Sequence, residues 1–395
     1  MDQEFMVPGF LANGMCCGIK EDGRKDLSLI FSTQKATAAG VFTKNAFKAA
    51  PVLLDMERIE RGEGQAVVVN SGIANAATGE EGLQDARYVS AVTSSRLKIP
   101  DELVYVASTG VIGHRVPVDK IERAMPELVS GLKETGIADA EEAIMTTDKM
   151  PKIALSKGTI DGKEITVCGM AKGAGMIEPH MATMLSFILT DATFERDTLD
   201  KVFRSAVDKS FNAITVDGCM STNDTALILA NGKAGGKPVR SAGNLQIFKT
   251  MLHHVLSELS YLMVKDGEGA TKVIEFCVEE AKSVAEARKV AYAVANSNLV
   301  KTAFYGGDPN WGRIIAAVGT VNEHIPVDAV RVSFDQVPIF EDGRGVTGFE
   351  SELKEIMASP RIRVRIRMGM GKKGFRLLSS DLSHEYVTIN AHYHT

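Results

Sequence analysis

One stretch, residues 172–192, constrains the fold of this chain more than any other. Its sequence is KGAGMIEPHMATMLSFILTDA. The first part contains residues that disfavour a regular helix or a central strand, namely Gly173, Gly175 and Pro179. The second part, residues 184–189, is apolar except for one serine, which predicts a buried strand. An irregular, glycine-rich segment is therefore expected to lead directly into a core strand.

A small residue followed by a hydroxyl, Ala182-Thr183, stands where these two parts meet. The Thr183 hydroxyl can attack the carbonyl carbon before it, exchanging an amide for an ester that water then opens. Cleavage leaves Thr183 with a free α-amino group, whose reference pKa is about 7.7–8.0, so that a useful fraction is unprotonated near neutral pH. That amine can act as the base for its own hydroxyl. A plain strand threonine with a satisfied hydroxyl is the alternative interpretation of the same two residues.

Composition excludes several classes of protein. A length of 395 residues is enough for two or three domain-sized units with a large core. The formal net charge of −5 gives no case for binding nucleic acid or an anionic membrane surface. The sequence has no run of 18 apolar residues and no signal peptide at its start, so we expect no membrane span and a cytoplasmic location. The five cysteines form no CxxC pair, which predicts neither a zinc site nor a disulfide framework.

Hydrophobic periodicity predicts an α/β protein in which strands and helices alternate. Strands are expected at residues 27–32, 66–70, 103–107, 153–155, 165–171, 184–189 and 273–278, and helices at 80–98, 117–134, 197–211, 246–265 and 283–297. Residues 368–374, MGMGKKG, match a formal GxGxxG pattern, but the chain continues as a strand, which predicts a hairpin turn rather than a dinucleotide site. The last ten residues, YVTINAHYHT, are predicted to be a strand.

Three further segments carry residue types that suit chemistry. Thr109 and Gly110 end a predicted strand, where a hydroxyl and a backbone amide together suit an oxyanion; a simple turn is the alternative. Glu268 lies between two glycines in KDGEGATK, so its backbone can approach a substrate closely. Residues 214–232 combine a strand, a polar turn and a second strand. The short polar side chains of that turn suit either the floor of a polar site or a loop that satisfies its own hydrogen bonds.

Nine blocks of sequence, in order, carry a resemblance to a known family. They are GVFTKNAFKAAPV, VNSGIANAATG, STGVIG, MTTDKMPK, KGAGMIEPHMATML, ITVDGCMSTNDT, KDGEGATK, VKTAFYGGDPNWGR and YVTINAHYHT. The chain resembles the ornithine acetyltransferases (glutamate N-acetyltransferases, bifunctional in many members), and the resemblance covers nearly all of it.

This resemblance implies self-cleavage between Ala182 and Thr183 into chains 1–182 and 183–395. Both chains would build a layered α-β-β-α core, with a smaller α/β domain in the C-terminal half. Thr183 would be the nucleophile, and Thr109 with Gly110 the oxyanion hole. The implied substrate contacts are Thr147, Lys172, Thr183, Glu268, Asn390 and Thr395. A charged hydrogen bond from Lys172 suits a substrate α-carboxylate, whereas Glu268 suits an ammonium group or a proton relay.

The implied reaction has two steps: acetyl passes from N-acetylornithine to Thr183 and then to glutamate. No metal or tightly bound cofactor is implied, and acetyl-CoA stays open as an alternative donor. The implied partners are amino-acid substrates, the protein's own two chains and an oligomer of the two-chain unit. Two alternatives remain at this point: an N-terminal-threonine amidohydrolase or aminopeptidase on the same site, and an uncleaved, non-catalytic homologue that acts as an interaction protein.

Four positions depart from the family pattern. Ile73 and Cys219 stand where Asn and Asp are usual, and His392 and His394 stand where an acid and a small or basic residue are commoner. These departures spare the predicted nucleophile, the oxyanion pair and Lys172. They leave the choice of substrate open.

Overall fold

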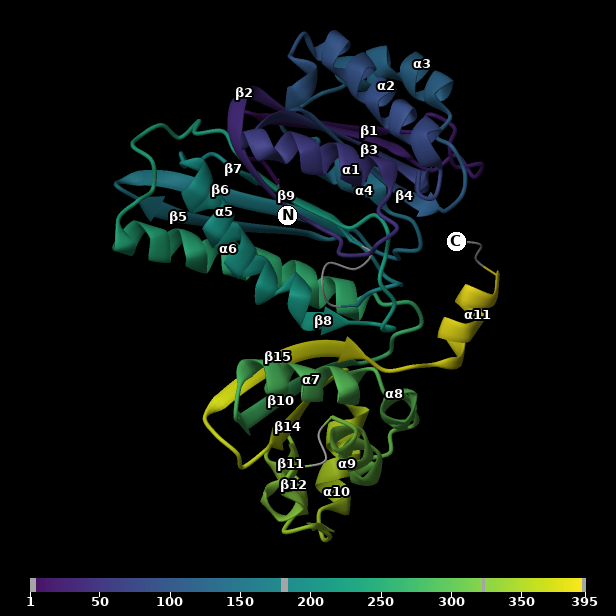
Figure 1. The fold of residues 1–395 in the computed structure, drawn as a ribbon, viewed down its shortest axis with the longest axis vertical. Coiled ribbons are helices and arrows are strands. Elements are labelled where there is room, and N and C mark those ends of the chain that lie inside the picture. The colour runs from purple at the N-terminus through teal and green to yellow at the C-terminus, as the bar shows by residue number, and fades with distance from the viewer. Residues whose placement is uncertain (1–4, 179–183, 322–323, 393–395) are drawn as a thin grey trace. The chain divides into compact units, whose positions relative to one another are not determined.

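The computed structural model describes residues 5–178, 184–321 and 324–392. The chain forms two compact units, each with one β-sheet and its own helices (Figure 1). Unit 1 contains the described residues of 1–212 and 219–263, and unit 2 those of 213–218 and 264–393. The predicted α/β class and the smaller α/β domain in the C-terminal half are confirmed.

Unit 1 is built on an eight-stranded sheet with the order β4-β3-β2-β9-β7-β6-β5, and β1 also pairs with β2. The strands are β1 (Phe10–Met15), β2 (Leu27–Phe42), β3 (Glu63–Ile73), β4 (Val104–Val111), β5 (Ile153–Ile160), β6 (Lys163–Lys172), β7 (Leu185–Thr190) and β9 (Thr225–Ala230). The strand β7, which follows the predicted cleavage bond, lies between β6 and β9. Segments on both sides of that bond therefore share one sheet.

The long strand β2 divides this sheet into two halves, because its register shifts between Phe31 and Ala36. Its first part pairs with β1 and β3, and its last part pairs with β9. Alternate side chains of both halves meet in one apolar cluster, which includes Val67 of β3, Phe187 of β7 and Leu229 of β9. Two sheet layers thus face each other within unit 1.

Helices cover the outer faces of these two layers (Figure 1). The helices of unit 1 are α1 (Ala50–Arg58), α2 (Gly79–Leu97), α3 (Val118–Ser130), α4 (Ile137–Ile144), α5 (Arg196–Asp208) and α6 (Ala242–Lys265). Apolar residues of α2 and α3 pack with Val68 and Val106 in a second cluster. On the other layer, a Cβ at Gly169 of β6 would lie 2.9 Å from Val255 and from Leu259, both on α6. These contacts confirm the predicted α-β-β-α layering.

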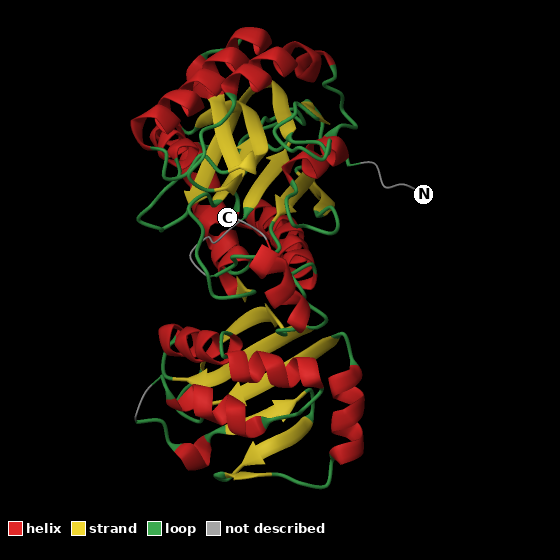
Figure 2. Cartoon of the chain, turned by 90° about the vertical axis from the view of Figure 1, so that its right-hand side faces the viewer, coloured by secondary structure: helices red, strands yellow, loops and turns green. Residues whose placement is uncertain are grey.

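Unit 2 is built on a seven-stranded sheet with the order β13-β12-β11-β14-β10-β15-β8. Its strands are β8 (Ile214–Thr215), β10 (Val273–Ala281), β11 (Arg331–Phe334), β12 (Val337–Glu341), β13 (Arg344–Gly345), β14 (Arg361–Arg367) and β15 (Lys373–Ser380). Its helices are α7 (Val284–Ala295), α8 (Asn298–Gly306), α9 (Trp311–Gly319), α10 (Glu350–Ala358) and α11 (His384–His392). Figure 2 shows helices against one face of this sheet.

Four short 3₁₀ helices complete the description: η1 (Ile59–Arg61), η2 (Asp101–Leu103), η3 (Phe211–Ala213) and η4 (Val327–Ala329). Within the described ranges, no helix is long and apolar enough to cross a membrane.

Two predictions for the end of the chain are wrong. The turn at residues 368–372 does not close a hairpin, because β10 lies between β14 and β15 and pairs with both. The chain end is helix α11 rather than a strand as far as it is described. Asp381, directly after β15, accepts hydrogen bonds from the amides of Thr271 (2.8 Å) and Lys272 (3.0 Å). This attachment stops β15 pairing, so the following residues leave the sheet and take up a helix.

Candidate active site

The predicted oxyanion pair, Thr109 and Gly110, ends β4 beside the end of β3. Gly110 lies opposite Gly72 and has φ +133°, in the region that favours glycine. A Cβ at Gly110 would lie 2.2 Å from the carbonyl carbon of Gly72, so no other residue fits there. Because the close approach of the two backbones requires glycine at position 110, no side chain of its own covers the Gly110 amide. This geometry suits the predicted role.

Lys172, the last residue of β6, reaches the same point from the other layer of unit 1. Its ammonium nitrogen lies 3.3 Å from the Thr109 hydroxyl oxygen and 2.7 Å from that of Thr146. The side chain is only 3% exposed. Sequence reasoning proposed Lys172 and Thr109 separately, and the fold brings them into contact across 63 residues of chain.

Asp148 balances the charge of this ammonium group. One of its oxygens lies 3.8 Å from Lys172 Nζ and accepts the Thr146 amide at 2.9 Å. The other oxygen accepts from Lys152 Nζ and from the amide of Gly173, both at 2.7 Å. Burial alone would raise the pKa of Asp148, but the two lysines and these hydrogen bonds hold that pKa well below its usual range. The carboxylate is therefore ionised and fixes the position of Lys172.

The segment 145–148, which includes the predicted substrate contact Thr147, lies beside Lys172. Thr146 and Asp148 contact Lys172, whereas Thr147 is half-buried in the same segment and stays a predicted substrate contact. Sequence reasoning missed Thr146 and Asp148. The signal was a cluster of hydroxyls followed by an acid, and only the fold shows which of two adjacent threonines faces Lys172.

The start of β7 is held by the loop before β9. Asp224 Oδ1 accepts the amide of Met184 at 2.9 Å, and Asn223 Nδ2 donates to the carbonyl oxygens of Ala74 (2.6 Å) and Ser108 (2.8 Å). Ala182 and Thr183 themselves lie outside the described residues. The polar turn in residues 214–232 was expected to suit a site floor, but sequence reasoning did not single out Asn223 or Asp224.

A second group of predicted site residues lies in unit 2. Asn390 Nδ2, on α11, donates to Glu268 Oε2 at 2.8 Å and to the Tyr386 carbonyl oxygen at 3.0 Å. Glu268 is 7% exposed and precedes Gly269, where a Cβ would lie 2.4 Å from the Tyr386 amide. The glycine thus lets α11 approach the turn that carries Glu268. Thr395 lies outside the described residues.

The four departures from the family pattern are spread over the chain. Ile73 ends β3 opposite Thr109, and both Cys219 and His392, the latter at the end of α11, are exposed. His394 lies outside the described residues. In the part of the chain that the structure describes, no three His, Cys, Asp or Glu side chains gather in a way that could hold a metal ion.

A hydroxyl and a glycine amide at a strand end, with a buried ammonium group against that hydroxyl, can stabilise the oxyanion that forms in acyl transfer. The ArgJ family model matches residues 11–395, so the chain belongs to the ArgJ family.

Two relatives of full length agree with this assignment. The arginine biosynthesis bifunctional protein ArgJ of Geobacter sulfurreducens is 48% identical and covers 98% of this chain and 100% of its own length. Its counterpart from Syntrophotalea carbinolica is 47% identical over 98% of this chain and 99% of its own length. A crystal structure of ArgJ from Bacillus halodurans matches with a TM-score of 0.43 and 42% identity, over 45% of this chain and 92% of that chain.

The predicted family and the predicted class of enzyme, an acetyltransferase of arginine biosynthesis, are confirmed by this membership. The roles of individual residues, the cleavage and the division into chains 1–182 and 183–395 stay predictions.

Proposed function

We propose that this protein transfers an acetyl group from N-acetylornithine to glutamate through an acetyl ester on Thr183. The observation that carries the proposal is the contact between Lys172 and Thr109. An ammonium group is only a donor, so the Thr109 oxygen accepts from Lys172 and its own hydroxyl hydrogen is left to donate elsewhere. A hydroxyl polarised in this way is a stronger donor toward an oxyanion.

In the first half-reaction, the Thr183 hydroxyl attacks the acetyl carbonyl carbon of the donor while the Thr183 α-amine takes up its proton. The negative charge that develops on the carbonyl oxygen would be stabilised by the Thr109 hydroxyl and the Gly110 amide. The tetrahedral intermediate collapses, the C–N bond breaks, and ornithine leaves as an amine after accepting that proton. In the second half-reaction, the glutamate amine attacks the ester and Thr183 is regenerated.

Glu268 and Asn390 stay predicted substrate contacts, and their chemistry suits an ammonium group. Asn390 donates one amide hydrogen to Glu268 and so fixes the orientation of the carboxylate. The remaining lone pairs of Glu268 are then available for an ammonium group, and such a charged bond is about twice as strong as a neutral one. Thr147 and Thr395 stay predicted substrate contacts.

The reaction as proposed needs no metal or tightly bound cofactor, and acetyl-CoA would serve as a co-substrate if the protein also acetylates glutamate directly. We place it in the cytoplasm, as an oligomer of the two-chain unit.

Two measurements test the proposal. Intact mass and a denaturing gel should show the wild-type chain cut between Ala182 and Thr183, with Thr183→Ala uncut and inactive and Thr183→Ser, which keeps a hydroxyl, able to cut. A wild-type chain of full mass after prolonged incubation would instead support an uncleaved, non-catalytic protein.

Product analysis with and without glutamate then separates transfer from hydrolysis. We expect acetylglutamate and ornithine in equal amounts when glutamate is present, and little ornithine beyond one acetyl-enzyme equivalent when it is absent. Steady release of acetate without glutamate would identify a hydrolase.

A further inference from the structure

Two consecutive side chains in the loop before β9 contact two different parts of the proposed catalytic machinery. Asn223 contacts the ends of β3 and β4, whereas Asp224 contacts the start of β7. Asn223 is 6% exposed and Asp224 is fully buried. Asn223 also has partners within the loop, since its Oδ1 accepts from the Thr222 hydroxyl at 2.6 Å and its backbone amide donates to Ser221 Oγ at 3.1 Å. The side chains of Asn223 and Asp224 nevertheless each reach a separate segment of unit 1.

Asn223 contacts β4, the strand that ends in the predicted oxyanion pair (below, the oxyanion strand). Both hydrogens of its amide group are used, one on the Ala74 carbonyl oxygen at 2.6 Å and one on that of Ser108 at 2.8 Å. The Ser108 carbonyl and the Thr109 amide belong to the same planar peptide unit. Asn223 therefore sets the orientation of the peptide that leads into the oxyanion pair.

Asp224 acts on the segment that follows the proposed nucleophile. Its Oδ1 accepts the Met184 amide at 2.9 Å, while the Thr225 amide donates to the Met184 carbonyl oxygen at 3.1 Å. Met184 is thus held on both of its backbone polar groups. By covalent geometry, the Met184 amide lies in the peptide plane that joins it to residue 183.

The state of the Asp224 carboxyl separates it from an ordinary ion-pair residue. Burial raises its pKa well above the usual range, although the Met184 amide, Lys172 and the Thr43 hydroxyl act in the opposite direction. Its second oxygen, Oδ2, accepts no hydrogen bond from any described residue. Burial thus favours the neutral form of the carboxyl, whose shape an amide reproduces.

We propose that Asn223 and Asp224 are positioning residues that hold the oxyanion strand and the nucleophile in register for both self-cleavage and acetyl transfer. This inference rests on the proposed function, because it takes Thr183 as nucleophile and Thr109 with Gly110 as oxyanion donors. Because Asn223 and Asp224 are adjacent in the chain, the segments that they contact cannot shift far relative to one another. A misplacement of about 1 Å at a reacting centre can cost about 100-fold in rate.

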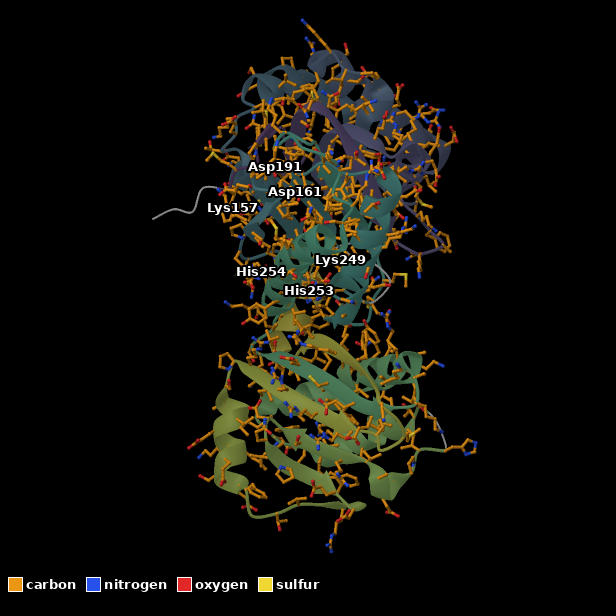
Figure 3. The ribbon with its side chains drawn as sticks, turned by 90° about the vertical axis from the view of Figure 1, so that its left-hand side faces the viewer. Lys157, Asp161, Asp191, Lys249, His253 and His254 are labelled. Carbon is orange, nitrogen blue, oxygen red and sulfur yellow. The ribbon has the colours of Figure 1, made fainter. Side chains whose placement is uncertain are left out.

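The chain offers a matched control at the opposite end of β7. Asp191 directly follows that strand, is 2% exposed and accepts the Thr166 amide at 2.8 Å. Burial also raises the pKa of Asp191. Lys157 of the β5–β6 hairpin, labelled together with Asp191 in Figure 3, acts to lower that pKa. Removal of the Asp191 carboxyl costs the same kind of hydrogen bond without touching Met184.

The test measures, for each variant of the full chain, the time course of cleavage, kcat per cleaved molecule, KM for glutamate and Tm. For Asp224→Ala we expect cleavage and kcat to fall by about 100-fold while KM changes by less than about threefold. Asp224→Asn keeps an acceptor for the Met184 amide and should stay within about fivefold of wild type. Asp191→Ala should lower Tm as much as Asp224→Ala does, with kcat per cleaved molecule unchanged.

Asn223→Asp should behave in the opposite way to Asp224→Asn and lower kcat, since a carboxylate cannot donate to two carbonyl oxygens. We expect it to be at least as slow as Asn223→Ala, although its shape is nearly that of wild type.

If Asp224→Ala does not fold, Asn223→Ala and Asp224→Asn still test the inference. Equal kcat per cleaved molecule for Asn223→Ala and wild type, or equal losses for Asp224→Ala and Asp191→Ala, would overturn the inference. Cleavage of wild type but not of Thr183→Ala, together with acetylglutamate as the product of wild type, shows in the same experiment that the proposed function stands, so the two failures are distinguishable.

Discussion

The two units of this protein each contain a charged cluster, and the clusters differ in their access to water. In unit 1, the side chains of Lys152, Asp148 and Lys172 are 0%, 0% and 3% exposed. In unit 2, Glu275 on β10 is 4% exposed, but its partners Arg361, Arg363 and Arg376 are 48%, 42% and 54% exposed. One cluster is entirely buried, whereas in the other only the carboxylate is buried.

This difference distinguishes the buried cluster of unit 1, which belongs to the candidate site, from the cluster of unit 2, which is a structural feature of the sheet. Burial of an ion pair costs desolvation energy that the attraction often does not recover, so buried charges such as Lys172 are expected where chemistry needs them. Half-exposed arginines keep much of their hydration, and each such pair contributes little. The strand β14 is held instead by its other face, where Ile362, Val364 and Ile366 are buried. We therefore expect substitutions in unit 1 to have much larger effects.

The largest effect is expected for Asp148→Ala. It leaves the ammonium groups of Lys152 and Lys172 buried without their carboxylate, which typically costs about 3–5 kcal/mol in the free energy of unfolding. Urea denaturation measures it, with Glu275→Ala as the counterpart in unit 2. Because the arginines stay hydrated, the unit 2 variant should lose far less. Equal shifts of the two midpoints would remove the distinction between the clusters.

The next largest effect is on catalysis, and it tests whether the buried cluster of unit 1 contributes to the reaction. Thr109→Ala removes the hydroxyl that accepts from Lys172, and the loss of one oxyanion donor typically lowers kcat by about 100- to 1,000-fold. Steady-state kinetics on cleaved protein measures it, with Thr109→Ser as the control that keeps a hydroxyl. A raised KM with unchanged kcat would instead make Thr109 a residue of ground-state binding.

A third prediction challenges the comparison, because unit 2 also has a buried lysine. Lys301, on α8, donates to the carbonyl oxygen of Ser380 and to the hydroxyl of Ser379. Burial lowers its pKa from 10.5 to about 8, although Asp217 and Asp381 oppose the shift. Between about pH 8 and 10.5 the unfolded state binds more protons at this group, so its penalty to stability fades as the pH rises.

We therefore expect the unfolding free energy of wild type, relative to Lys301→Met, to increase by up to about 1.4 kcal/mol per pH unit within that window. Urea denaturation of both proteins at pH 7, 8, 9 and 10 measures the difference, and subtraction removes the titration that they share. A difference that is flat with pH would mean that Lys301 titrates normally.

The smallest effect is expected for Arg376→Ala. Its guanidinium lies 2.6 Å from Glu275 but is 54% exposed, and Arg361 and Arg363 remain on the same carboxylate. A loss of about 0–1 kcal/mol follows, and it should shrink further in high salt. Denaturation with and without added salt measures it. A loss as large as that of Asp148→Ala would show that exposure does not separate the two clusters.

Local patterns predicted much of the fold, because they depend on residues close in sequence. Apolar spacing predicted α2 and α5, and the helix expected at residues 283–297 is α7, where Ser283 Oγ accepts the Glu286 amide. The same patterns failed for residues 386–392, where valine, threonine and isoleucine favour a strand by propensity. Attachment of Asp381 to residues 271–272 overrides that propensity.

By itself, the sequence determined the kinds of residue at the candidate site and the local backbone that carries them. Glycine at 110 permits the close approach to Gly72, and an apolar run after residue 183 predicts the core strand β7. Only the tertiary structure decided the partners, because contacts across the chain depend on how strands pair. Lys172 meets Thr109 across 63 residues, and Asn223 meets Ser108 across 115. A local pattern shows that a side chain is polar, whereas packing of distant strands selects the group that it contacts.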